Sequence, residues 1–144
     1  MARTIITGVD GSESAARAAH RAAELADALG AELHVLSAYG KLEVEKIDTG
    51  AEQFIIDSMT DAERVARRVV DDLQGAFPGL AVTASPAEGK PGDALLEAAD
   101  RLGAELIVVG NKRVQGIGRV LGSVARDVTT RATCDVYVAH THQR

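Results

Sequence analysis

The segment Val108–Val124, with the sequence VVGNKRVQGIGRVLGSV, has the pattern of a strand, a glycine-rich loop and the start of a helix. An apolar run ends at Gly110, and Ser123 opens a stretch with helical character. Amides at the start of a helix lack intrahelical partners and carry partial positive charge, so they attract anions. Because glycines let a phosphate approach the backbone closely, this pattern predicts a phosphate-binding loop. The alternative is a flexible connection whose glycines only make turns.

The composition indicates one globular domain, residues 1–144, that can bury a core without disulfides or metals. The net charge of −5 and the absence of Trp argue against a nucleic-acid partner. No apolar run reaches the length of a membrane-spanning helix, so no membrane partner is expected. The first residues lack a signal-peptide pattern, which predicts a cytoplasmic location.

Side chains that could form a metal or catalytic cluster are few and dispersed. Cys134 is the single cysteine, and we expect it to be a buried structural thiol rather than a reactive one. The chain has no G-x-S-x-G elbow and no Walker A motif, so we predict no catalytic residue. The four histidines are far apart in the sequence: His20, His34, His140 and His142.

Five apolar, strand-like runs alternate with four segments of helical periodicity. The segment from Gly40 to Ala51 has no period and is interpreted as a loop. The predicted strands are Thr4–Val9, Leu33–Tyr39, Ala81–Ser85, Glu105–Val109 and Val136–Ala139. The first predicted helix begins after Asp10 or Ser12 and ends at Gly30, and the last covers Ser123–Ala132. The second runs from Ile55 to about Gly75, with Met59, Ala62, Ala66, Val69 and Leu73 facing the core. The third runs from Gly92 to Gly103, with Leu95, Leu96, Ala99 and Leu102 facing the core.

This alternation predicts an α/β fold, an open and doubly wound sheet of five parallel strands in the order 3-2-1-4-5. Ligands of such sheets bind at the carboxyl ends of the strands, where the strand order reverses. That crevice lies between the first and fourth strands. The junctions beside it are Gly8–Ser12 and Gly110–Gly122, the two junctions richest in glycine and polar residues.

Three stretches resemble the universal stress protein family: Gly8–Ser12 (GVDGS), Leu33–Val35 (LHV) and Val109–Val124. The resemblance extends from Arg3 to His140. It implies a five-stranded, adenine nucleotide alpha hydrolase-like fold, frequent dimers, and, in many members, adenine nucleotide binding through G-x2-G-x9-G-[ST]. We expect a homodimer through the last strand, because pairing with a second copy would cover this apolar edge.

The glycine motif departs from the family pattern at two points. Arg113 occupies the position of the second glycine, and eight residues rather than nine, Val114–Leu121, separate it from Gly122. The Arg113 guanidinium could bind phosphate, or its bulk could close the site. The loop also carries Gly116 and Gly118, which could restore part of its flexibility.

The resemblance implies contacts between a nucleotide and residues of both junctions. Asp10 would contact the ribose or hold Mg²⁺ that accompanies the nucleotide, or it would only cap the following helix. The backbone of Val35 would read the adenine edge. Gly110 and the start of the last helix would hold the phosphates, or Gly110 would be a turn glycine and Ser123 a helix cap. The full predicted set is Gly8, Val9, Asp10, Val35, Val109, Gly110, Asn111, Arg113, Gly122, Ser123 and Val124.

The function expected is a universal stress protein that binds ATP or a related adenine nucleotide in a regulatory role, with slow hydrolysis at most. The alternative is a dimeric stress adaptor that has lost the nucleotide through the change at Arg113 and the shortened loop. A phosphoacceptor receiver domain is disfavoured, because Asp10 has no acidic neighbour until Glu13. An adenylating enzyme is disfavoured too, because GVDGS is not S-G-G-x-D-S.

Overall fold

The computed structural model describes residues 3–40, 51–111 and 121–141, with side chains from residue 56 onward in the second of these ranges. One sheet of five strands in the order β3-β2-β1-β4-β5 confirms the predicted fold, and all four strand pairs are parallel. The elements are β1 (Thr4–Gly8), α1 (Glu13–Leu29), β2 (Glu32–Tyr39), α2 (Ala51–Ala76), β3 (Val82–Glu88), α3 (Pro91–Leu102), β4 (Leu106–Gly110), α4 (Ser123–Arg131) and β5 (Asp135–Ala139).

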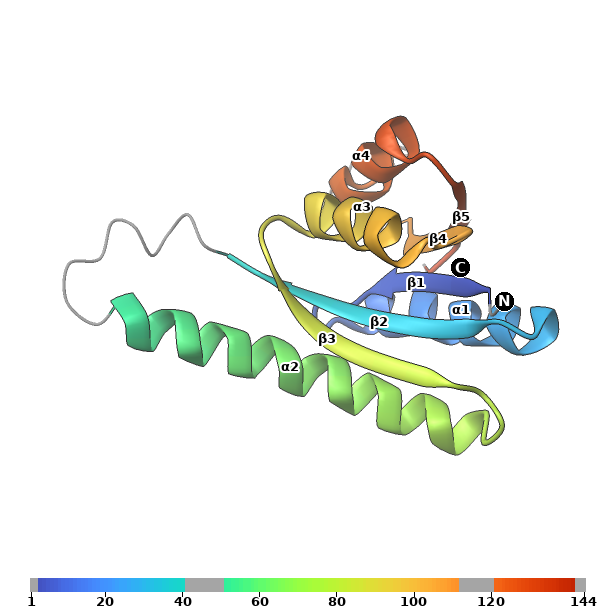
Figure 1. Ribbon diagram of the computed structural model, residues 1–144, viewed down its shortest axis with the longest axis horizontal. Coiled ribbons are helices and arrows are strands. Elements are labelled where there is room, and N and C mark those ends of the chain that lie inside the picture. The colour runs from blue at the N-terminus through green and yellow to red at the C-terminus, as the bar shows by residue number, and fades with distance from the viewer. Residues whose placement is uncertain (1–2, 41–50, 112–120, 142–144) are drawn as a thin grey trace.

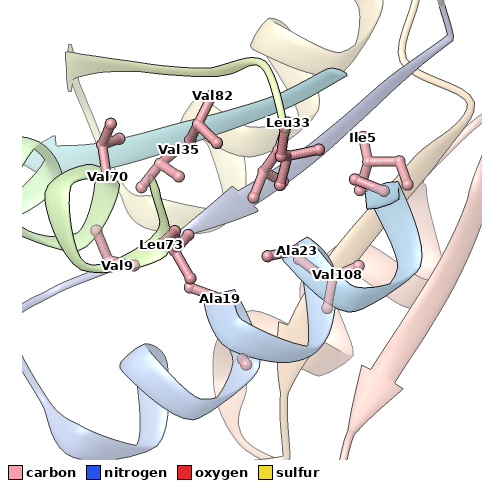
Figure 2. Packing of buried hydrophobic residues seen from close by; sticks show 14 of the residues in the cluster. Ile5, Val9, Ala19, Ala23, Leu33, Val35, Val70, Leu73, Val82 and Val108 are labelled. Carbon is pink, nitrogen blue, oxygen red and sulfur yellow. The ribbon is translucent and has the colours of Figure 1, made fainter. Parts of the chain in front are cut away.

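The sheet separates two hydrophobic clusters, because successive strand side chains point to opposite faces. Ile5 packs in the cluster beneath α1 and α2, and Ile6 packs in the cluster beneath α3 and α4. Figure 1 shows these two helix pairs on opposite faces of the sheet. In Figure 2, Leu33 and Val35 of β2 lie in one layer with Val70 and Leu73 of α2. The site therefore rests on a sheet that is buried on both faces.

Helix α1 lies close to the sheet because its buried residues are all alanines: Ala18, Ala19, Ala22, Ala23 and Ala26. Ser12 is its N-cap, with the side-chain oxygen accepting from the Ala15 amide, and Gly30 ends it in the left-handed conformation. Of the two predicted caps, the structure thus selects Ser12. Asp10 instead accepts a hydrogen bond from the Ser12 amide at 2.9 Å.

Two elements are longer than predicted. Helix α2 begins at Ala51, the last residue of the segment interpreted as a loop. The predicted helix began four residues later, at Ile55. Strand β3 continues through Pro86 to Glu88, three residues beyond the predicted end at Ser85. Because β3 is an edge strand, a residue without an N–H is tolerated at its outer side.

Two residues predicted to face the core are exposed. Met59 of α2 is 37% exposed, and Leu102 of α3 is 36% exposed. In α2 the buried stripe instead includes Val70, with Ala62, Ala66 and Leu73 as predicted. No helix among the described residues is long and apolar enough to cross a membrane.

Candidate functional site

A cavity of about 130 Å³ lies at the carboxyl ends of β1 and β4, at the predicted reversal of strand order. It brings residues of the two junctions together with the end of β2 and the starts of α1, α3 and α4. Its walls are mainly apolar, and its polar side chains come from the first junction and α1. The lining residues are Gly8, Val9, Asp10, Ser12, Ser14, Ala15, Leu36, Ala38, Pro91, Leu95, Val109, Gly110 and Val124.

At the first junction, the predicted residues Gly8, Val9 and Asp10 all line the cavity. Gly8 is tightly packed, because a Cβ there would lie 3.3 Å from Leu95 Cδ1. Gly11 has a φ of 87°, a backbone conformation that L side chains rarely adopt. This turn directs the chain from β1 into α1 and places the Asp10 carboxylate at the mouth of the cavity.

Val35 does not reach the cavity. It has no exposed surface and packs in the cluster beneath α1 and α2, as Figure 2 shows. Leu36 and Ala38 line the cavity instead, because they point to the other face of β2 and stand nearer its carboxyl end. A backbone contact from Val35 to a nucleotide stays a prediction, and on β2 the residues that line this cavity are Leu36 and Ala38.

At the second junction, Val109 and Gly110 also line the cavity. Gly110 ends β4 without a positive φ, so it is not the turn glycine that the alternative required. A Cβ at Gly110 would lie 3.2 Å from Thr141 Cγ2 and 3.6 Å from Ala18 Cβ. Glycine is therefore needed here for close packing against α1 and the segment after β5.

Asn111 does not line the cavity but holds the segment that follows β5. Its side-chain oxygen Oδ1 accepts from the Thr141 amide at 2.9 Å and from Thr141 Oγ1 at 3.0 Å. Its backbone N–H donates to the Ala139 carbonyl, and its Nδ2 lies 3.1 Å from His140 Nδ1. The Asn111 side chain thus has a structural role, and its contact with a ligand stays a prediction.

The start of α4 has no side-chain cap among the described residues. Gly122 is the N-cap, and Ser123, predicted as the alternative cap, is an exposed first helical residue. Gly122 and Ser123 stand beside the cavity, and Val124 lines it. The first amides of this nine-residue helix are available to an anion. Arg113, together with Gly116 and Gly118, lies outside the described residues.

A second cleft, of about 330 Å³, opens on the α2 side of Asp10. It shares Asp10 and Ala38 with the first cavity, and Asp61 adds a second carboxylate. Two carboxylates repel a phosphate. The end of the site at β2 and α2 is thus unsuited to phosphate, whereas the end at α4 favours it.

The remaining candidate groups are remote from the cavity. Burial raises the pKa of the Cys134 thiol, and the charges of Asp135 and Asp100 raise it further, so the thiolate is disfavoured. His34 uses both ring nitrogens, Nδ1 to Thr83 at 2.7 Å and Nε2 to Ser85 at 2.8 Å. Within the described ranges, no three His, Cys, Asp or Glu side chains gather to hold a metal ion.

The model of the universal stress protein family matches residues 1–140 of the chain. The chain belongs to the universal stress protein family. Universal stress protein Rv1636 of Mycobacterium tuberculosis (strain ATCC 25618 / H37Rv) is 37% identical over 145 residues, covering 96% of this chain and 97% of that protein. The solved structure of Rv1636 has a TM-score of 0.60 with this chain at 35% identity, covering 99% and 98% of the two chains.

A second solved universal stress protein was crystallised in complex with cAMP. It is 34% identical to this chain and has a TM-score of 0.77, with 97% of this chain and 98% of that chain covered. A universal stress protein of Thermus aquaticus is 34% identical over 143 residues, covering 94% of this chain and 97% of the relative. The family thus accounts for the fold along nearly the whole chain.

Proposed function

We propose that this universal stress protein binds ATP or a related adenine nucleotide in a regulatory role with little or no turnover. The observation that carries the proposal is a cavity lined both by Asp10 of the first junction and by Val124 at the start of α4, where no described side chain caps the helix. The cAMP complex of a relative at 34% identity supports an adenine nucleotide as the ligand class. A cavity of about 130 Å³ accommodates part of a nucleotide and leaves the rest along its rim.

The lining suggests an orientation for this ligand. The base packs on the apolar wall of Leu36, Ala38 and Leu95, and the ribose lies between the two junctions near Asp10. The phosphates extend toward Gly122 and Ser123 at the start of α4, where amides and the helix dipole favour negative charge. Mg²⁺ would accompany the phosphates, since Asp10 offers one carboxylate and Mg²⁺ is held largely by phosphate and water in such sites.

A regulatory role fits the chemistry of the described lining residues. Asp10 is the single ionisable side chain among them. Fast phosphoryl transfer needs a group that orients the attacking water and a strong electrostatic clamp on the leaving group. Asp10 alone does not supply both, so hydrolysis is expected to be slow at most.

Titration calorimetry with ATP, ADP, AMP and cAMP tests the proposal. We expect measurable heat with at least one of them, and a weaker signal in the variant Leu95→Glu, which places a carboxylate on the apolar wall. The control is His34→Gln, remote from the cavity, which should bind as the wild type does. No heat with any of the four nucleotides would overturn the proposal.

The departure at Arg113 favours a second candidate function, that of a stress adaptor that binds no nucleotide. The variant Arg113→Gly distinguishes the two functions. If the wild-type protein is silent in calorimetry and Arg113→Gly binds ATP, the adaptor is supported. If both bind, the adaptor is excluded and the arginine is compatible with the ligand.

We also propose that two copies pair through β5, the edge strand beside β4. Tyr137 in the middle of this strand is 36% exposed, and an unpaired apolar edge is a site of association. Light scattering at micromolar concentration should give the mass of a dimer, and Tyr137→Lys should shift it toward the monomer. A wild-type monomer under these conditions would contradict the pairing.

A further inference from the structure

We propose that Ser14 is a specificity-determining residue: it accepts a hydrogen bond from an electropositive group of the ligand, because Thr141 takes its proton. This inference rests on the proposed nucleotide site and adds to it a statement about which part of the ligand faces α1. Ser14 lines the cavity, while Thr141 lies behind it, after β5, and is only 5% exposed.

The hydrogen bonds around Thr141 have a fixed direction. The Thr141 amide can only donate, so the Asn111 atom that it contacts at 2.9 Å must be the carbonyl oxygen Oδ1. Thr141 Oγ1 lies 3.0 Å from the same oxygen, and it must therefore donate its single proton there. The Thr141 carbonyl accepts from Arg17 at 3.1 Å, which holds this segment against α1.

The direction of the next bond follows. Ser14 Oγ and Thr141 Oγ1 are 2.7 Å apart, so one of the two hydroxyls donates to the other. Because the proton of Thr141 is already directed at Asn111, Ser14 must be the donor. The Ser14 hydroxyl then has only lone pairs to offer the cavity, and it favours a donor group over a phosphate oxygen.

Ser12, two residues earlier on the same rim, has the opposite polarity. Its Oγ accepts from the Ala15 amide at 3.1 Å, and its own proton enters no hydrogen bond that the described residues provide. The cavity thus has one serine that can donate to a ligand and one that can only accept. The electropositive group opposite Ser14 could come from a ribose hydroxyl or from a water molecule bound to Mg²⁺.

Calorimetry with ATP, 2′-deoxy-ATP and 3′-deoxy-ATP, each with and without Mg²⁺, separates these two sources. If a ribose hydroxyl is the donor, the wild type binds ATP about three- to tenfold more tightly than one of the deoxy analogues, the range of a neutral hydrogen bond. In Ser14→Ala this ratio falls to about one. If a Mg²⁺-bound water is the donor, Ser14→Ala instead removes a similar gain in affinity on adding Mg²⁺.

Two variants of Thr141 test the polarity itself. Thr141→Val keeps the shape that packs on Gly110 but removes the oxygen, which frees the Ser14 proton and should lower the same ratio as Ser14→Ala does. Thr141→Ser keeps the oxygen and should retain the wild-type ratio. A ratio is insensitive to general loosening of the site, and thermal unfolding without ligand shows that each variant is folded.

His34→Gln, which is remote from the cavity, is the control and should leave the ratio unchanged. Two results with a wild type that binds ATP would show that the inference is wrong while the nucleotide site stands. In the first, Ser14→Ala weakens the binding of ATP and of both deoxy analogues equally, with and without Mg²⁺. In the second, Ser14→Ala changes none of these affinities. If the wild type binds no nucleotide, the proposed function fails and the inference fails with it.

Discussion

The starts of α1 and α4 face the same cavity but are built in different ways. At α1, Ser12 caps the helix and Asp10 holds the Ser12 amide, so side chains satisfy the amides of the junction. At α4, Gly122 supplies no side chain, and no described side chain caps the helix. A helix start that is capped from within has less need of an anion, whereas an uncapped start gains from binding one. The comparison therefore favours α4 over α1 as the place for the phosphate of the proposed nucleotide.

The largest effect is expected from disrupting the turn that precedes α1. Gly11→Ala forces a side chain into a φ of 87° and should destabilise the protein by about 1–2 kcal/mol. Denaturant unfolding measures the change. The control is Gly75→Ala in α2, where a Cβ meets nothing within 4 Å and the better helix propensity should stabilise the protein. Equal effects of the two substitutions would show that the turn at Gly11 is not strained.

Adding a cap to α4 should remove the difference between the two helix starts. Gly122→Asp places a carboxylate on the amides that we assign to the phosphate, and nucleotide affinity should fall about tenfold, or about 1.4 kcal/mol. Without ligand the variant should be a few tenths of a kcal/mol more stable. Gly122→Asn provides a neutral cap and separates capping from charge repulsion. Unchanged affinity in both variants would contradict a phosphate at α4.

Removing the cap of α1 should have a smaller effect, and this effect should be on stability rather than on nucleotide affinity. Ser12→Ala leaves the Ala15 amide without its partner and should cost about 1 kcal/mol in the free energy of unfolding. Nucleotide affinity should change little, because the phosphate is assigned elsewhere. Thermal unfolding and calorimetry on the same sample check both statements. A loss of affinity larger than the loss of stability would reverse the comparison.

The smallest effect is expected at His34, far from both helix starts. Burial, with a further contribution from the charge of Arg101, lowers the pKa of His34 in the folded protein. The unfolded chain then binds the proton first, so the contribution of His34 to stability is complete above the usual histidine pKa, about 6.5, and is lost as the pH falls below it. Unfolding between pH 7.5 and 5 should show a shallower pH dependence in His34→Gln. An identical pH dependence would remove this assignment.

The order of the elements could be predicted from the sequence because the local signals agree with the fold. Gly30 and Gly103 end α1 and α3 in the left-handed conformation, as their positions after apolar periods predicted. The buried run of β4 was recognisable because a central parallel strand is apolar on both faces. The position of the cavity followed from the reversal of strand order.

Other features depend on contacts that the sequence does not display. Val35 and Ala38 stand on opposite faces of the same strand, and both the face and the distance to the strand end decide that Ala38 lines the cavity. The predicted third strand ended at Ser85, and the extension of β3 through Pro86 is possible because β3 is an edge strand. The hydrogen bond from Ser14 to Thr141 joins residues 127 positions apart, with no local signal in either segment.

Pro86 also limits how copies of this protein can assemble. A strand that approached β3 from outside would find no amide to pair with at that residue, next to the acidic side chain of Glu88 two positions on. The opposite border of the sheet, β5, contains no proline. A sheet in which only one edge strand can pair with another copy can join a single neighbour through a two-fold axis. It has no second pairing edge from which a continuous fibre could grow.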